Sequence, residues 1–174
     1  MNKYICECGH ISYSFDKIFD IPLTFPGNNI TYTIKDMLKQ YFNEQNIIWT
    51  QICPKCGKRN LKKKIIKFDI IKNKLFFSFQ RIDRISKSNN KLIVKYDIIN
   101  LNEYYDINIS EINNKYHLIG LIYHLGTLEN GHYKCDIKLD NQWFNFNDNY
   151  ISKINNIDMN SDKVCVLVYK RFKY

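Results

Sequence analysis

Residues 116–148 decide the fold of the second half of the chain, and they read YHLIGLIYHLGTLENGHYKCDIKLDNQWFNFND. The apolar run 118–123 predicts a first strand, a polar loop follows it, and a second strand begins at His132. A turn at residues 140–141 leads into a third strand that ends at Asn147. Two successive hairpins therefore predict that His132 and Asn147 are neighbours in space.

His132 is the candidate general base of this segment. An imidazole in that role needs its second ring nitrogen held by an amide or carboxylate oxygen, which Asn147 or the adjacent Asp148 can supply. Gly131 allows a backbone conformation that a Cβ would forbid, and it leaves room for an extended substrate. An ordinary surface histidine in a hairpin loop explains the same residues equally well.

The pattern of this segment resembles the histidine box of the ubiquitin-specific proteases, a papain-like family of thiol deubiquitinases. The matching residues are Tyr116, Leu118, His124, Gly126, Gly131-His132-Tyr133, Trp143 and Phe146-Asn147-Asp148. The resemblance implies that His132 is the catalytic histidine, that Asn147 is the third triad member, and that Asp148 is the acidic neighbour that follows it.

The same resemblance implies a substrate site for the C-terminal tail of ubiquitin. Its residues would be His124, Gly126, Gly131 and Tyr133. Two loops, 84–90 and 126–130, would close over the tail, with Gly126 and Gly131 as hinge points. Ordinary hairpin connections are the alternative interpretation of both loops.

Composition limits the classes of protein that need to be considered. The 174 residues carry 26 Lys and Arg against 17 Asp and Glu, a formal charge of +9. This charge permits salt-dependent binding to nucleic acid, but the basic residues are scattered, apart from a cluster at 58–64 that we interpret as solvated strand edges. Nucleic-acid binding is therefore a minor expectation. The chain has no apolar run of about 20 residues, so we expect no membrane span. The opening residues lack a signal-peptide pattern, so we expect an intracellular location, cytoplasmic or nuclear.

Four of the six cysteines form a candidate zinc site. Cys53 and Cys56 follow the C-P-x-C-G pattern of a zinc knuckle, whereas Cys6 and Cys8 are separated by a single residue, which weakens the pattern. Four thiolates would make a closed structural site, and four reduced thiols without metal are the alternative. In the ubiquitin-specific proteases, a comparable ribbon forms the fingers that hold ubiquitin.

The remaining segments predict an α+β fold with a mostly antiparallel sheet and one or two short helices. Residues 33–42 predict a helix with Thr33 and Asp36 as a capping box, and further strands are expected at 18–23, 61–71, 75–82, 92–99 and 164–171, with a loop at 151–162. The resemblance spans residues 4–172. It implies one partial catalytic domain, with zinc-ribbon fingers over about 1–74, a palm over about 75–174, and no papain-like thumb.

A nucleophile is missing from this pattern. No glycine- and asparagine-rich cysteine box occurs in the chain, Cys135 should face away from His132 on its strand, and Cys165 lies in an apolar strand. The chain could be a fragment, one part of a split enzyme whose cysteine half is a separate partner, or a pseudo-enzyme. Hydrolysis of ubiquitin conjugates is the first functional hypothesis, a non-catalytic ubiquitin-binding module the second, and a basic zinc ribbon that binds nucleic acid the third.

Overall fold

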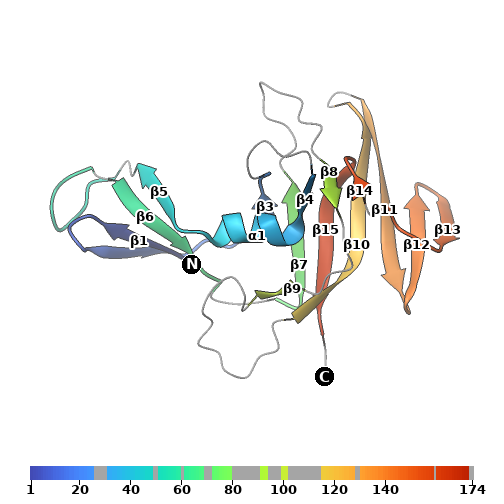
Figure 1. Cartoon of the computed structure of the whole chain (residues 1–174), viewed down its shortest axis with the longest axis horizontal. Coiled ribbons are helices and arrows are strands. Elements are labelled where there is room, and N and C mark those ends of the chain that lie inside the picture. Colours follow the sequence, from blue (N-terminus) through green and yellow to red (C-terminus); the bar gives the residue numbers. More distant parts are fainter. Residues whose placement is uncertain are drawn as a thin grey trace.

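A computed structural model describes residues 1–25, 31–48, 51–59, 61–68, 72–79, 91–93, 99–101, 115–127, 130–158 and 160–172. These residues form three sheets and one helix, with a small sheet at one end of the molecule, a large sheet at the other, and the helix between them (Figure 1). The α+β fold with a mostly antiparallel sheet is therefore confirmed. The predicted mobile loop at 84–90 lies outside the described residues.

The large sheet contains eight strands of the described chain. Its order is β13-β12-β11-β10-β15-β7-β3, with β9 paired to β10, and the pairs are antiparallel except for β3 with β7. The strands are β3 (Ile21–Leu23), β7 (Lys74–Phe79), β9 (Ile99–Asn100), β10 (Lys115–Gly126), β11 (Gly131–Leu139), β12 (Gln142–Asn147), β13 (Tyr150–Ile154) and β15 (Val164–Arg171). The two hairpins expected from the histidine box are β10–β11 and β11–β12.

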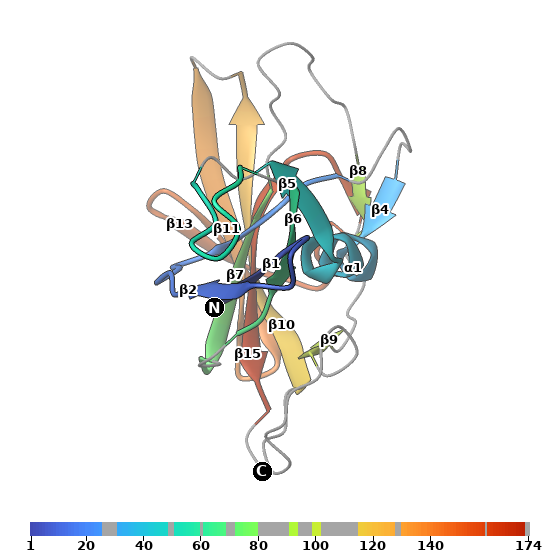
Figure 2. The same ribbon diagram turned by 90° about the vertical axis from the view of Figure 1, so that its left-hand side faces the viewer.

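The small sheet forms the other end of the molecule and faces the viewer in Figure 2. Its order is β2-β1-β6-β5, built from β1 (Asn2–Cys6), β2 (Ile11–Ser14), β5 (Gln45–Ile48) and β6 (Leu61–Ile66). The lysines at 62–64 lie on β6, a central strand, so the expectation of a solvated sheet edge was wrong: Lys62 is 3% exposed and Lys63 pairs with Glu44 at 2.7 Å.

A third sheet consists of β14 (Asn160–Ser161), β8 (Lys91–Ile93) and β4 (Thr31–Thr33). Helix α1 (Ile34–Phe42) follows β4 directly. Residues 1–74 contribute to more than the small sheet, because β3 belongs to the large sheet and β4 to the third sheet. The nine-residue α1, the helix of the described chain, falls short of the length that a membrane crossing needs.

Helix α1 begins as the sequence predicts. Thr33 is the N-cap, and its hydroxyl accepts a hydrogen bond from the Asp36 amide while the Asp36 carboxylate accepts one from the Thr33 amide. Ile34, Met37, Leu38 and Phe42 are buried on one face of the helix. This face joins the core formed by the inner face of the large sheet, where Phe77, Leu121 and Leu167 are at most 1% exposed.

The cap gives a first testable prediction. Replacing Thr33 with alanine removes the oxygen that the Asp36 amide donates to, so we expect the free energy of unfolding to fall by about 1 kcal/mol. Chemical denaturation followed by circular dichroism measures the loss. Thr33→Ser, which keeps the hydroxyl, should retain most of the stability, and equal losses in both variants would contradict the capping role.

Several strand boundaries differ from the sequence-based expectation: the strand expected at 61–71 ends at Ile66, and two further differences are informative. Residues 151–162 were expected to form a loop, but β13 occupies Tyr150–Ile154 and pairs with β12. Asp148, at φ +51°, reverses the chain within two residues, which is what a tight hairpin requires. The strand expected at 18–23 begins only at Ile21. Phe19 lies before the strand, where it is 85% exposed and its ring stacks on Phe76.

Candidate active site

His132 and Asn147 lie side by side at the ends of β11 and β12, and their side chains are joined by a hydrogen bond between His132 Nε2 and Asn147 Oδ1. The Asn147 oxygen can only accept, so Nε2 carries the proton and the neutral ring presents Nδ1 as its basic atom. The His132 side chain is 43% exposed, so Nδ1 is within reach of another molecule. The arrangement is that of an oriented general base.

Asp148 is the second neighbour of this histidine, and unlike Asn147 it carries an acid. Its Oδ2 lies 3.9 Å from His132 Nε2, and its side chain is 74% exposed. At that separation the carboxylate contributes charge, while the direct hydrogen bond belongs to Asn147. Asp148 is therefore placed to stabilise a protonated His132 ring, but it does not orient the ring.

Register separates the candidate site residues onto two faces of the sheet. His132 lies opposite Leu125, and alternation along the strands places it on the inner face with the buried Leu121 and Tyr123. His124 and Tyr133 are opposite each other one position away, so they share the outer face. Their rings are 4.6 Å apart and tilted by 34°. The histidine-box residues are thus close together along the chain, but they do not line a single surface.

The two glycines of this loop are needed for different reasons. Gly126 has φ +111°, and a Cβ there would approach the Asn130 carbonyl oxygen to 2.5 Å. Gly131 does not have a positive φ, so the expected special backbone conformation was wrong. A Cβ on Gly131 would instead overlap the imidazole of His124, which lies across it. A side chain at position 131 would therefore require the His124 ring to move from its place on the outer face.

The cysteines of the large sheet do not face His132. Cys135 is three positions along β11 and lies on the outer face, as alternation predicts. Burial and the neighbouring Asp136 raise the pKa of Cys135, which keeps it a thiol. Cys165 donates a hydrogen bond to the Ile122 carbonyl at 3.3 Å.

Four cysteine sulfurs converge at the end of the small sheet. The Sγ atoms of Cys6, Cys8, Cys53 and Cys56 all lie within 4.8 Å of one another, with Cys6–Cys56 at 3.9 Å and Cys8–Cys53 at 3.7 Å. Zn–S bonds of about 2.3 Å in tetrahedral geometry separate sulfurs by about 3.8 Å. The four donors therefore fit a tetrahedral, sulfur-liganded ion with no open coordination position.

Both cysteine turns close in similar ways despite their different spacing. The Gly57 amide donates to the Cys53 carbonyl at 2.8 Å, and the Gly9 amide donates to the Cys6 carbonyl at the same distance. Gly9 and Gly57 have φ of +79° and +70°, which favours glycine at each turn. The single residue between Cys6 and Cys8 is therefore accommodated by a shorter turn that still brings the sulfurs together.

Without a cation, the thiols of this cluster do not ionise alike. The Cys56 amide, followed by the Lys55 amide, lowers the pKa of Cys53 to about 6. The Cys8 amide favours the thiolate of Cys6, but burial and the neighbouring sulfurs outweigh it and raise the pKa of Cys6 to about 11. Close sulfurs resist sharing several negative charges, and a divalent cation removes this conflict.

A buried polar network next to the dyad was not anticipated from the sequence. Asp136 is 5% exposed on the inner face, where it accepts hydrogen bonds from Tyr123 Oη at 2.7 Å and Asn145 Nδ2 at 2.6 Å. Burial, followed by Asp136, raises the pKa of Tyr123, so its hydroxyl keeps its proton. Asn145 is two residues before Asn147 on β12, so the network ties β10 to the two strands that carry the dyad. The sequence signal that could have revealed this network is Asp136 itself, an acid at a position of β11 that faces the core.

Replacing Asp136 with alanine should be strongly destabilising. The change leaves the Tyr123 hydroxyl and the Asn145 amide without their buried acceptor, so we expect the free energy of unfolding to fall by about 3 kcal/mol. Urea denaturation measures the effect. The matched control is Asp162→Ala, because Asp162 makes only an exposed ion pair with Lys163 at 3.5 Å, and its loss should cost less than about 0.5 kcal/mol. Similar losses in both variants would contradict the role of the network.

The architecture is a β-rich palm joined to a four-cysteine ribbon, with His132 and Asn147 hydrogen-bonded at the end of one hairpin. The chain belongs to the ubiquitin carboxyl-terminal hydrolase family, whose model matches residues 28–169. The resemblance to the ubiquitin-specific proteases is therefore confirmed.

Several curated proteins are similar over most of the chain. A protein of Acanthamoeba polyphaga mimivirus, named as a probable ubiquitin carboxyl-terminal hydrolase, is 27% identical over 95% of this chain and 37% of its own length. Ubiquitin carboxyl-terminal hydrolase 5 of Arabidopsis thaliana is 28% identical over 86% of this chain and 17% of its own length. The chain thus spans well under half the length of these relatives.

Solved structures share the fold. The SAGA DUB module of Ubp8, Sgf11, Sus1 and Sgf73 bound to monoubiquitin contains a chain that matches with a TM-score of 0.78 at 20% identity. A yeast SAGA DUB module carrying an Sgf73 mutant matches with a TM-score of 0.79 at 21% identity. Each match covers 99% of this chain and 40% of the other.

Proposed function

We propose that residues 1–174 form the fingers and palm of a thiol-dependent deubiquitinase and supply its general base from this chain. The observation that carries the proposal is the hydrogen bond from His132 Nε2 to Asn147 Oδ1, which leaves Nδ1 free for proton transfer. Family membership makes a ubiquitin conjugate the natural substrate. An intracellular location, where thiols stay reduced, forms part of the proposal.

The reaction assigns one proton-transfer atom to His132. Nδ1 takes the proton from a cysteine thiol, and the resulting thiolate attacks the carbonyl carbon of the C-terminal glycine of ubiquitin. The protonated ring then gives that proton to the leaving lysine amine as the isopeptide bond breaks and a thioester remains. Nδ1 next deprotonates a water molecule, which hydrolyses the thioester and regenerates the thiol. Asn147 holds the ring throughout, and Asp148 stabilises its charged form.

The nucleophile in this proposal comes from outside residues 1–174, on a separate or preceding segment. Cys135 lies on the face opposite His132, and four other cysteines lie together at the far end of the small sheet. The oxyanion donors would come from the same outside segment. Of the residues that the resemblance assigns to the ubiquitin tail, Gly126 and Gly131 lie at the hairpin end beside His132 and would guide the tail, whereas His124 and Tyr133 lie on the opposite face and would support this end of the hairpin.

The small sheet would hold the globular part of ubiquitin. We infer that Cys6, Cys8, Cys53 and Cys56 bind zinc, which would fix the end of this sheet without taking part in chemistry. An exposed apolar stripe runs along β2 and the residues after it. It consists of Ile11, Tyr13 and Phe15, which are 42%, 53% and 68% exposed. Apolar residues gathered at the surface favour a protein contact.

The test uses ubiquitin with a C-terminal propargylamide, an electrophile that traps an activated cysteine. The chain alone should bind ubiquitin without covalent labelling. After addition of a cysteine-bearing segment encoded with or beside it, labelling should appear on the cysteine of that segment and should require His132. Removing the last residues of ubiquitin should abolish labelling, while binding through the small sheet persists.

Other outcomes would overturn parts of the proposal. Labelling of Cys135 or Cys165 would show that the nucleophile lies within residues 1–174. Binding without labelling in any mixture would identify a ubiquitin-binding module that has lost catalysis. The absence of both binding and labelling would overturn the deubiquitinase assignment itself.

A further inference from the structure

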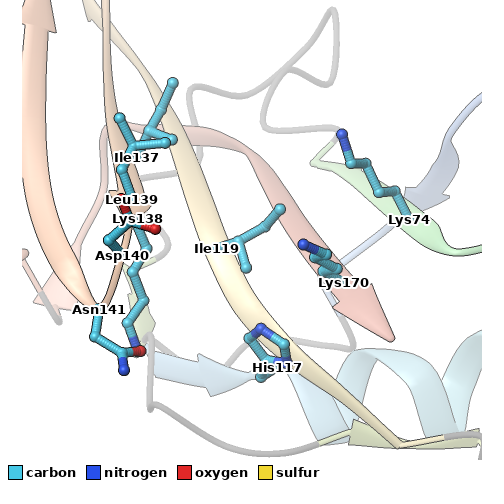
Figure 3. Close-up of a pocket in the computed structure, with 9 residues that line it drawn as sticks. All are labelled: Lys74, His117, Ile119, Ile137, Lys138, Leu139, Asp140, Asn141 and Lys170. Carbon is cyan, nitrogen blue, oxygen red and sulfur yellow. The ribbon is translucent and has the colours of Figure 1, made fainter. Parts of the chain in front are cut away.

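The outer face of the large sheet carries a row of basic side chains at one level. Lys74 on β7 is paired with Lys170 on β15, and Lys170 is paired with His117 on β10. Figure 3 shows these three side chains on neighbouring strands. Like charges directly opposite each other repel. Neither lysine forms an ion pair with an acidic residue of the described chain.

The row borders a pocket of about 440 Å³, within the roughly 300–1,000 Å³ of ligand sites. Ile119, Ile137 and Leu139 supply its apolar surface, and Leu139 is 48% exposed. Asp140 also lines the pocket, so its charged groups Lys74, Lys138, Lys170 and Asp140 remain positive in sum. An apolar floor beneath unpaired cations favours a ligand that combines an apolar group with negative charge.

His117 is the uncharged member of this row. Its Nδ1 atom is buried and has no hydrogen-bond partner within the described part of the chain. The ring packs against Phe172, with centroids 4.6 Å apart. Burial, followed by Lys138 and Lys170, lowers the pKa of His117, so the ring stays neutral at neutral pH. The positive charge of the pocket therefore comes from its lysines, and the neutral ring adds none.

We propose that this pocket docks an acidic segment of a partner protein, which places an aliphatic side chain on Ile119 and Ile137 and sets carboxylates against Lys74 and Lys170. The floor is aliphatic and offers no aromatic face for stacking, which disfavours a nucleic acid. A second copy of the chain is disfavoured because each copy carries a formal charge of +9. The pocket is on the face opposite His132, so it recruits a partner without entering the catalytic groove.

Fluorescence anisotropy with a labelled model peptide tests this site on the chain 1–174. The probe is acetyl-Glu-Asp-Glu-Leu-Asp-Glu-amide, and its matched control carries Ser in place of Leu. We expect the probe to bind at least about tenfold more tightly than the control, and Lys74→Glu with Lys170→Glu to weaken it by at least about tenfold. The charge-matched control is the double variant Lys39→Glu with Lys55→Glu, at two exposed lysines outside the pocket lining, and it should change binding less than about twofold.

A second arm separates this site from other anion binding and from misfolding. Circular dichroism of each variant, together with its retained binding to ubiquitin, establishes that the fold and the proposed ubiquitin surface are intact. Equal affinity for both peptides, or no loss in the double Lys variant, would overturn the docking site. Tighter binding of single-stranded RNA or of phosphatidylserine vesicles, with the same dependence on Lys74 and Lys170, would reassign the pocket and likewise overturn the proposal.

Discussion

His132→Ala should lower kcat/KM for hydrolysis of a ubiquitin C-terminal amide by about 10³- to 10⁴-fold once the cysteine-bearing segment is supplied, because the change removes the ring that Asn147 orients as the general base. Asn147→Ala should cause a smaller loss, since the ring remains but rotates and exchanges tautomers. Ubiquitin affinity should stay unchanged in both variants. Rates with a ubiquitin–rhodamine substrate and binding by calorimetry measure the two effects separately.

The matched control for this prediction is Ser152→Ala, an exposed residue on β13 that lies opposite Asn145 of β12, the strand that carries Asn147. Its rate should stay within about twofold of the parent. The tautomer of His132 can be measured directly on residues 1–174 alone. The ¹⁵N spectrum should show a proton fixed on Nε2 in the parent chain, and Asn147→Ala should remove this preference for Nε2. Retention of more than half of the activity in His132→Ala would contradict the assignment of the base.

Cys53→Ser should remove metal binding from the small sheet. Purified chain is expected to carry about one zinc ion, and the variant should bind zinc more than about 100-fold more weakly, because a direct ligand matters more than the groups that orient ligands. The hydrogen bonds between β1 and β6 should then lose protection from hydrogen exchange, while those of β10 with β15 keep theirs. Plasma emission spectroscopy and amide exchange measure these changes.

A strong chelator should reproduce the effect of the Cys53 variant on the parent chain, and added zinc should reverse it. Cys165→Ser serves as the matched control, because Cys165 lies in β15 far from the cluster along the chain, and its loss should leave the zinc content unchanged. Equal zinc content in Cys53→Ser and the parent would contradict a four-sulfur site. Uniform loss of protection in both sheets would contradict a local structural role.

Local sequence signals were sufficient where a single element decides the outcome. The capping box of Thr33 and Asp36, the turn at 140–141 with its positive φ values, and strand β15 were all predictable, because each depends on residues a few positions apart. The juxtaposition of His132 with Asn147 was also predictable, since two tight hairpins leave little freedom in register. The convergence of the four cysteines was predictable because two closely spaced cysteine pairs are typical of a zinc site.

By itself, the sequence determined the histidine box, the capped helix and the set of four cysteines, each through short-range chemistry. Only the tertiary structure decided that His124 lies over Gly131 on the outer face, that Asp136 joins Tyr123 to Asn145, and that Lys74 and Lys170 stand opposite each other. These contacts depend on which strands become neighbours and in what register. That choice is made by burial of the whole core, which no local pattern encodes.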